Sequence, residues 1–478
     1  MAGEHHNVFT GEYIPIAIKD YTILQGVSQT QTRLYGENMI EGTGVVTMGI
    51  ERYGMTLRDL SITTSNAAAI FSFGVHSCFV QNITIENSTV GRYLFVTGYI
   101  TSTFTLSNIT MQNNIAYFHD YGLRLEGSVI TIDNILMRNN QVPSLPSYWY
   151  QRGCGGFDIY VKDLLTIKNS KFINNTHYSE DGYSNFRVNT LSDLWNSVVT
   201  FDNCMFASNF AYGGVRDIRF VNINVLNLIN CTFANNTNNY TDYLYISSES
   251  SSIVNCLFSN NNSYYEIRSN NNTLVENSLF SRSNNIWRTY NGEPLIWGQN
   301  NLTGTDPLFS GTDPTLPSYY YLFADDEHGY SPAIDAGTTD PSILPDGYLI
   351  PSYDAFGFNR IHGNNIDIGC FESPGYTGNG NNTTPTSATL VMNCYPNPFK
   401  ADLAIRMDIP VKGLLNLSAY NIKGQLIKRV YSDYVNKGTH LLIWDGKDFN
   451  NQRVGPGVYL IKLDTGSKSI VKKVMMMD

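Results

Sequence analysis

Apolar and polar residues alternate along the first 300 residues in short segments that resemble one another. When eight of these segments are aligned on a shared Asn, an apolar residue stands two positions before it and another three positions after it. Period-two alternation predicts short strands that bury one face. The distance from one shared Asn to the next, which we call a step, is mostly 22 to 27 residues. The shared positions are Asn82, Asn108, Asn134, Asn169, Asn203, Asn230, Asn255 and Asn277, with Asp59 as an earlier member.

A second Asn follows five residues after most of the first ones. It occurs at Asn87, Asn113, Asn139, Asn174, Asn235 and Asn260. Asn tolerates the left-handed backbone conformation that a sharp corner needs. Stacked Asn amides can also hydrogen-bond to one another as a ladder. One unit cannot bury its apolar face alone, so the repeat predicts a stack of coils with a continuous core.

This repeat resembles the right-handed parallel β-helix of the pectate-lyase-like proteins. The sequence therefore predicts an all-β chain, with a right-handed parallel β-helix over residues 1–300. Residues 301–373 include Ser331-Pro332-Ala333-Ile334-Asp335 and Asp367-Ile368-Gly369-Cys370-Phe371-Glu372. They resemble the closing segment of bacterial secreted β-helix proteins, and we expect them to cap the open end of the stack. Their acidic residues are expected to serve turns and ladders rather than catalysis.

The last 90 residues have a different pattern. A polar linker at residues 374–388 precedes short alternating segments that predict a small Ig-like β-sandwich at residues 389–478. Residues 389–478 resemble the C-terminal sorting domain of the type IX secretion system of Bacteroidetes-like bacteria. The matching positions are Tyr395, Pro396, Asn397, Pro398, Gly424, Gly457, Lys472 and Lys473.

The resemblance to a sorting domain implies a destination. It implies recognition by the type IX secretion translocon, and a mature protein that is secreted or held on the outer-membrane surface of a Gram-negative bacterium. It also implies a signal peptide. The first residues, Met1-Ala2-Gly3-Glu4-His5-His6, do not have the pattern of a signal peptide. We therefore expect the natural chain to begin before Met1.

Charge narrows the classes of partner. The chain is acidic, with a net charge of −10, and only 15% of its residues are charged. This argues against a nucleic-acid partner, which would require a basic face. The excess of acid belongs to the repeat, because residues 390–478 contain 13 Lys and Arg against 7 Asp. No run of about 18 apolar residues occurs, so no transmembrane segment is predicted.

Seven cysteines are spread over the chain and do not suggest a disulfide framework. Cys204, Cys231 and Cys256 each follow an Asn of the repeat, so we expect them to share one position. Buried stacked thiols are the favoured interpretation, and a reactive or metal-binding trio is the alternative.

Two long steps of the repeat, between Asn134, Asn169 and Asn203, are the first candidates for a binding face. Insertions in a solenoid emerge as loops on one face. Aromatic rings beside carboxylates suit a sugar, with Ca²⁺ as the one ion that the acids could hold. No other cofactor or metal ligand is predicted. The candidate ligand-binding residues are Tyr148, Trp149, Tyr150, Arg152, Tyr178, Tyr183 and Trp195, with Asp158, His177, Glu180 and Asp181 nearby.

Lys168 is a candidate for chemistry. Asp133, Lys168 and Asp202 each stand one residue before their Asn, so Lys168 is expected between two carboxylates of adjacent strands. In a polysaccharide lyase such a Lys would remove the proton beside a uronate carboxyl group. A surface charge ladder of little energetic value is the alternative. The weak catalytic candidates are Lys168, Glu180 and Asp181.

Two hypotheses of function remain from the sequence. The favoured one is a secreted or cell-surface β-helix that displays a glycan- or surface-binding face, adhesin-like and without catalysis. The other is a polysaccharide lyase or glycoside hydrolase that acts on extracellular acidic polysaccharide. Because one scaffold hosts enzymes and non-enzymes, the fold alone does not choose between them.

Overall fold

We describe the protein from a computed structural model. The described residues are 3–6, 16–29, 31–36, 44–48, 51–64, 68–90, 94–116, 122–143, 156–178, 185–190, 196–212, 217–238, 242–269, 272–289, 295–311, 313–325, 328–373, 390–395, 397–399, 403–409, 413–435, 438–450, 452–466 and 468–477.

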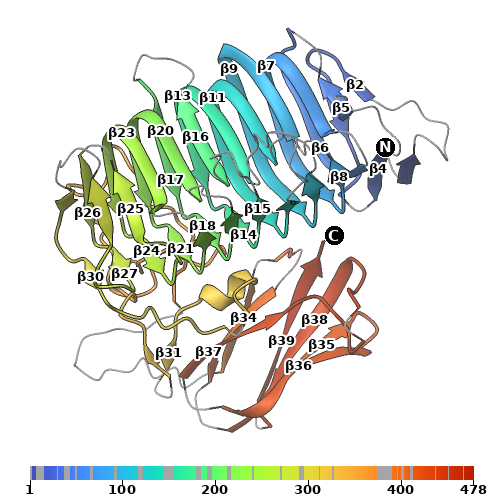
Figure 1. The fold of residues 1–478 in the computed structure, drawn as a ribbon. Helices are drawn as coiled ribbons and strands as arrows, with labels where there is room; N and C mark the ends of the chain where they lie inside the picture. Colours follow the sequence, from blue (N-terminus) through green and yellow to red (C-terminus); the bar gives the residue numbers. More distant parts are fainter. Residues whose placement is uncertain are drawn as a thin grey trace.

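The repeat forms a stack of parallel coils, which we call the solenoid (residues 16–303). Each strand pairs in parallel with its equivalent in the next coil, so that Val80 lies beside Leu106, Leu106 beside Ile132, and Ile132 beside Ile167. Figure 1 shows these coils side by side from the blue end of the chain to the yellow-green. The prediction of an all-β chain is confirmed, and the pairing is compatible with the predicted β-helix.

The strands of the solenoid form one large parallel sheet and a smaller one. The large sheet contains β1 (Gly3–His6), β2 (Ile16–Ile18), β3 (Ile23–Gln25), β4 (Thr32–Gly36), β5 (Gly44–Met48), β6 (Met55–Thr64), β7 (Ala68–Glu86), β9 (Leu94–Gln112), β11 (Leu123–Arg138), β13 (Phe157–Lys168), β14 (Lys171–Ile173), β16 (Phe186–Thr190), β17 (Val198–Asp202), β18 (Met205–Ala207), β20 (Ile218–Ile229), β21 (Thr232–Ala234), β23 (Asp242–Val254), β24 (Leu257–Ser259), β25 (Tyr265–Ser269), β26 (Thr273–Glu276), β27 (Leu279–Phe280), β28 (Trp287–Thr289), β29 (Ile296–Trp297) and β30 (Leu302–Thr303). The smaller sheet contains β8 (Thr89–Val90), β10 (Ile115–Ala116), β12 (Gln141–Val142), β15 (Thr176–Tyr178), β19 (Phe210–Tyr212) and β22 (Thr237–Asn238).

The core of the solenoid consists of columns of equivalent side chains. Phe206, Phe233, Phe258 and Phe280 stack face to face along the axis, with ring centroids 4.7 to 5.4 Å apart. The three thiols Cys204, Cys231 and Cys256 are fully buried in the same core. Burial raises the pKa of Cys204 and Cys231 well above the ordinary value of a thiol. The interpretation as buried thiols is confirmed.

The Asn positions are corners, as predicted. Asp59 and the eight aligned Asn residues have φ between 47° and 62°, and so do the second Asn residues. Side-chain amides link neighbouring coils at the first corner: Asn108 Nδ2 donates to Asn82 Oδ1 at 3.0 Å, and Asn134 to Asn108 at 2.9 Å. The ladder shifts by one residue at two places. There Asn169 donates to Asp133 and Asn230 to Asp202.

A further Asn ladder, not predicted from the sequence, lies inside the coil. Each member is at most 2% exposed. Asn114 accepts from the backbone amide of Ser88, and every later member accepts from both the backbone and the side-chain amide of its neighbour in the preceding coil. Each also donates to a backbone carbonyl, as Asn209 does to Phe172 at 2.8 Å. Every polar atom of these amides is therefore satisfied, as burial requires. The members are Asn114, Asn140, Asn175, Asn209, Asn236 and Asn261.

The closing segment packs along the side of the solenoid, and the expectation that it caps the open end is corrected. Residues 305–373 include η1 (Pro317–Tyr320), β31 (Ala324–Asp325) and β32 (Gly329–Tyr330). Their apolar side chains pack on outward-facing residues of successive coils, with Tyr321 and Phe371 in one cluster with Met205 and Ala234. Figure 1 shows this yellow-to-orange segment beside the coils rather than across their end. It covers strands that the sequence alone would place at the surface.

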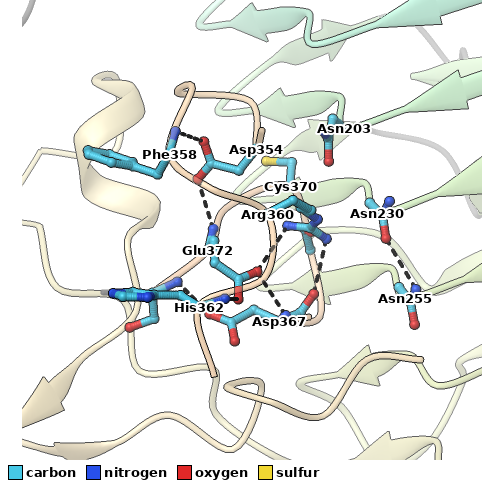
Figure 2. A network of polar contacts seen from close by, with 12 residues as sticks. Asn203, Asn230, Asn255, Asp354, Phe358, Arg360, His362, Asp367, Cys370 and Glu372 are labelled. Carbon is cyan, nitrogen blue, oxygen red and sulfur yellow. Dashed lines mark hydrogen bonds and ion pairs between the residues drawn. The ribbon is translucent and has the colours of Figure 1, made fainter. Parts of the chain in front are cut away.

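A buried polar network holds the closing segment in shape (Figure 2). Arg360 is fully buried and donates to the carbonyls of Asp367 and Gly369, while Glu372 lies 3.7 Å from it. Asp354 accepts from the backbone of Phe356, Phe358 and Glu372. The acids therefore close turns, as predicted, and do not face solvent.

The Asn corners bind the closing segment to the solenoid. Asn255 donates to the carbonyl of Thr338 at 3.0 Å and accepts from its amide at 2.7 Å, and Asn203 donates to the carbonyl of Tyr353. Figure 2 shows Asn203, Asn230 and Asn255 in a line beside this segment.

The C-terminal domain contains two antiparallel sheets. One contains β33 (Val391–Tyr395), β34 (Leu403–Ile409) and β37 (Gly438–Trp444), and the other β35 (Gly413–Asn421), β36 (Leu426–Val435), β38 (Gly457–Asp464) and β39 (Ser469–Met476). Trp444, Phe399 and Tyr459 pack between them. The described residues thus form the small sandwich that the sequence predicts.

Candidate functional site

Most of the aromatic candidates lie outside the described residues. Of the predicted ligand-binding residues the structure describes Tyr178, which is half-buried with its ring 5.6 Å from that of Phe210. The others stay predictions, as do two of the three weak catalytic candidates. The candidates outside the described ranges are Tyr148, Trp149, Tyr150, Arg152, Glu180, Asp181, Tyr183 and Trp195.

Lys168 lies in register between Asp133 and Asp202, as predicted. Lys168 and Asp133 are exposed, and Asp133 accepts from the amide of Asn169 at 2.9 Å. Asp202 is buried under the closing segment, where Tyr348 Oη donates to it at 2.8 Å. The two acids therefore have different environments, and Asp202 has no exposed oxygen to offer a substrate.

A row of arginines runs across the solenoid and was not predicted. Its members are the second residues of β11, β13, β16, β20 and β28 and the fourth residues of β23 and β25. Successive members are direct parallel neighbours. The residues on either side, such as Leu123 and Leu125, are buried in the core, so the row faces outward. We call it the arginine row; its members are Arg124, Asp158, Arg187, Arg219, Tyr245, Arg268 and Arg288.

Two buried carboxylates hold the arginines in place. Asp158 is contacted by Arg124 and Arg187, with Arg187 Nε 2.6 Å from its Oδ1. Asp242 is held in the same way by Arg268 and Arg288, at 3.3 and 2.8 Å. Both Asp side chains are 0% exposed, whereas these four Arg side chains retain 12 to 35% exposure.

Tyrosine rings lie against the guanidinium groups of the arginine row. Arg124 lies 4.0 Å from the ring centroid of Tyr160, whose hydroxyl group accepts from Arg187 at 2.7 Å. Arg219 and Arg268 lie 5.4 and 5.6 Å from the centroid of Tyr245. Cation–π contact of this kind fixes the plane of a guanidinium group.

The sequence did contain a signal for this row. An Arg stands between two core residues in Leu123-Arg124-Leu125, Phe186-Arg187-Val188 and Ile218-Arg219-Phe220. An alignment on the Asn corners does not show it, because the number of residues from the corner to this strand varies between coils.

In the sequence, the aromatic-rich segments of the two long steps adjoin two strands of this row. The residues before Phe157 lead directly into the strand of Asp158, and those before Asn185 into the strand of Arg187. Within the described ranges, no group of three or more His, Cys, Asp or Glu residues is placed to hold a metal ion.

In the C-terminal domain the first predicted sorting motif lies against the last strand. Asn397 Nδ2 donates to the carbonyl of Lys473 at 3.0 Å, and its Oδ1 accepts from the amide of Met475 at 2.8 Å. Phe399 continues the pairing through backbone bonds to Met475 and Met477. The Asn-Pro-Phe part of the motif therefore covers part of the free edge of β39, while Pro396 lies outside the described residues.

The other predicted sorting residues occupy turns and the last strand itself. Gly424 has φ of +76° in the turn that Asn421 closes by accepting from Lys423 and Gln425. Gly457 has φ of +152° at the start of β38, and Lys472 and Lys473 are exposed on β39.

Residues 393–477 match a family described as the secretion system C-terminal sorting domain. This part of the chain is similar to the sorting domains of the type IX secretion system. It supports export by the type IX system and indicates a secreted or cell-surface protein of the Bacteroidetes.

A solved structure of PorZ, described as an essential bacterial surface component of the type-IX secretion system of Porphyromonas gingivalis, is similar over a short stretch. The likeness covers 18% of this chain and 11% of PorZ, at 17% identity and a TM-score of 0.15. No curated protein matches the sequence. Among the described residues, no helix is long and apolar enough to cross a membrane.

Proposed function

We propose that the protein is an exported solenoid that displays a glycan-binding face at the cell surface or outside the cell. The observation that supports this proposal is the arginine row, in which ordered guanidinium groups and tyrosines line one outward face. The sorting domain supplies the destination, because it directs the chain to the extracellular side, where polysaccharides are the abundant polymers.

The sequence of the two long steps contains further candidates for sugar contact. Tyr148, Trp149 and Tyr150 precede the strand of Asp158 in the sequence, and Tyr183 precedes that of Arg187. Aromatic side chains provide flat apolar surfaces against which sugar rings pack.

A lyase or hydrolase is the second candidate. The observation in its favour is the position of Lys168 between Asp133 and Asp202. The burial of Asp202 counts against it, because this acid bonds to Tyr348 and Asn230 instead of facing solvent.

A screen of the full chain against acidic and neutral polysaccharides tests both candidates. It would record binding, unsaturated products and new reducing ends, with and without Ca²⁺. Binding without cleavage is the expected result. Cleavage would favour the enzyme, and failure to bind any polysaccharide would overturn the proposed function.

A further inference from the structure

Three aromatic rings cluster on the outer face of the smaller sheet, on the adjacent strands β15 and β19. His177 and Ala211 are fully buried, so the residues on either side of them in these strands face outward. Tyr178 and Tyr212 are direct parallel neighbours, and Phe210 stands two residues before Tyr212. The ring centroid of Tyr178 lies 5.6 Å from that of Phe210 and 5.7 Å from that of Tyr212. The rings of Phe210 and Tyr212 lie 6.4 Å apart, with planes that differ by 19°. We call these three rings the aromatic patch.

The sheet itself does not require aromatic residues at these positions. In register with Phe210, the neighbouring coils carry Gln141 on β12 and Thr237 on β22. Tyr212 is 46% exposed, and Tyr178 and Phe210 are half-buried. Single exposed apolar side chains are common on protein surfaces, whereas a contiguous exposed patch is typical of an interaction site. The aromatic patch therefore has the character of a binding surface.

The strands that carry the aromatic patch are uncharged. Over the ranges that the structure describes, the strand residues of the smaller sheet include no Lys, Arg, Asp or Glu. Their histidine, His177, is buried in the core, and burial lowers its pKa to about 4, so it is neutral at pH 7. The chain as a whole has a net charge of −10. An uncharged ligand is the best complement to this uncharged part of an acidic protein.

The size of the aromatic patch suits a small ligand group rather than a protein. An aromatic side chain buries about 150 to 250 Å², so three of them offer less than about 750 Å². Two of the three are already half-buried, whereas a stable protein interface buries about 800 Å² per partner. Aromatic rings provide apolar surfaces for the faces of sugar rings, and tyrosine hydroxyl groups can hydrogen-bond with sugar hydroxyl groups.

We propose that the aromatic patch binds a neutral polysaccharide, whose sugar rings stack on Tyr178, Phe210 and Tyr212. This inference rests on the proposed glycan-binding function, and it names the class of glycan and the residues in contact with it. Stacking depends on apolar contact and on hydrogen bonds between neutral groups. Salt should therefore have little effect on the affinity, unlike an interaction between exposed charges.

The test compares soluble polymers on the full chain. Hydroxyethyl cellulose, dextran and galactomannan are neutral, and carboxymethyl cellulose and polygalacturonate are anionic. Affinity electrophoresis and calorimetry at low and high salt measure the binding of each. The inference predicts that at least one neutral polymer binds, with an affinity that does not fall as salt rises.

Variants assign the binding to the aromatic patch. Tyr212→Ala removes the most exposed ring and is expected to weaken binding about tenfold, the loss of one stacking contact. Tyr212→Phe keeps the ring and should retain most of the affinity, which separates stacking from hydrogen bonding. The control is Tyr434→Ala on β36, which removes an exposed ring of the C-terminal domain and should bind as wild type. Thermal unfolding shows whether each variant is folded.

The outcomes separate the two proposals. Binding of anionic polymers alone overturns this inference and leaves the glycan-binding function standing. Binding of no polysaccharide overturns both. Neutral binding that is equal in wild type and in folded Tyr212→Ala, or that is lost equally in Tyr434→Ala, overturns the assignment to the aromatic patch. If Tyr212→Ala does not fold, Tyr212→Leu, which keeps an apolar side chain without a ring, takes its place under the same criteria.

Discussion

The side-chain amide of Asn397 bonds to the backbone carbonyl of Lys473, although the two residues are 76 positions apart. Together with its bond to the amide of Met475, it joins the first motif of the sorting domain to the last strand. A sorting signal of separated sequence motifs is thus one structural unit around β39.

We predict that Asn397→Ala loosens the last strand and reduces export. Loss of the two bonds should lower the free energy of unfolding of the domain by about 1 kcal/mol. Chemical denaturation and the fraction of the chain outside the cell measure the two effects. Asn416→Ala is the control, because that exposed side chain bonds only to the side chain of Ser432 among the contacts described. Equal export of both variants would contradict the prediction.

The buried Asn ladder is predicted to contribute strongly to stability. Asn209→Ala removes four hydrogen bonds and leaves the amide of Asn175 and the carbonyl of Phe172 buried without them. We expect a loss of about 3 kcal/mol or more in chemical denaturation. Asn262→Ala, at an exposed position nearby, should cost less than about 0.5 kcal/mol. Similar costs for both would show that the ladder adds little.

Buried acids predict the pH dependence of stability. Burial raises the pKa of Asp217 from 3.8 to about 7. The native state therefore keeps a proton that the unfolded chain has already released, and stability falls as the pH rises between about 4 and 7. Burial lowers the pKa of His177 to about 4, so its contribution to stability is lost as the pH falls below about 6.5.

Asp217→Asn separates the contribution of the acid from that of the histidine. Between pH 5 and 8, wild type should lose about 2 to 3 kcal/mol more stability than this variant. Asp346→Asn, at an exposed turn, should follow wild type. Denaturation curves at each pH provide the measurement, and parallel curves for wild type and Asp217→Asn would show that Asp217 does not titrate in this range.

Lys168 is predicted to be dispensable. Its side chain is exposed between Asp133 and a buried Asp202, which is the environment of a surface charge and not of a catalytic base. Lys168→Ala should change the free energy of unfolding by less than about 0.5 kcal/mol and leave polysaccharide binding unchanged. Loss of a cleavage activity in this variant would support the enzyme instead.

The sequence predicted the corners of the solenoid because their chemistry is local. A left-handed corner favours Asn, Asp and Gly, and Asn82 and Asn108 show this preference in a single sequence, although Ser208 occupies one of the second corners. The buried ladder was not predicted, although most of its residues are the second Asn of a pair such as Asn113-Asn114. Which of two adjacent Asn residues turns inward depends on the path of the coil.

The arginine row and the position of the closing segment could not be predicted in the same way, because both depend on contacts between residues that are distant in the sequence. Ile173, Met205 and Ala234 are apolar where earlier coils have outward-facing polar residues such as Gln112, which is a signal that something covers them. The pattern does not say what covers them. That part of the fold follows from contacts across more than 100 residues, as in the hydrogen bond from the amide of Cys370 to the hydroxyl group of Thr232.

The last prediction concerns this covering segment. The hydroxyl group of Tyr348 donates to Asp202 and accepts from Asn230, both at 2.8 Å, and so joins the closing segment to two coils. Tyr348→Phe leaves a buried carboxylate with one partner fewer, and we expect a loss of about 2 kcal/mol. Residues 305–373 should then become more sensitive to limited proteolysis than the coils. Tyr353→Phe is the matched control, since its ring is exposed and its backbone carbonyl makes the contact with Asn203. If both variants resist protease as wild type does, the other contacts of the segment, such as those of Asn255 and Phe371, are sufficient to hold it in place.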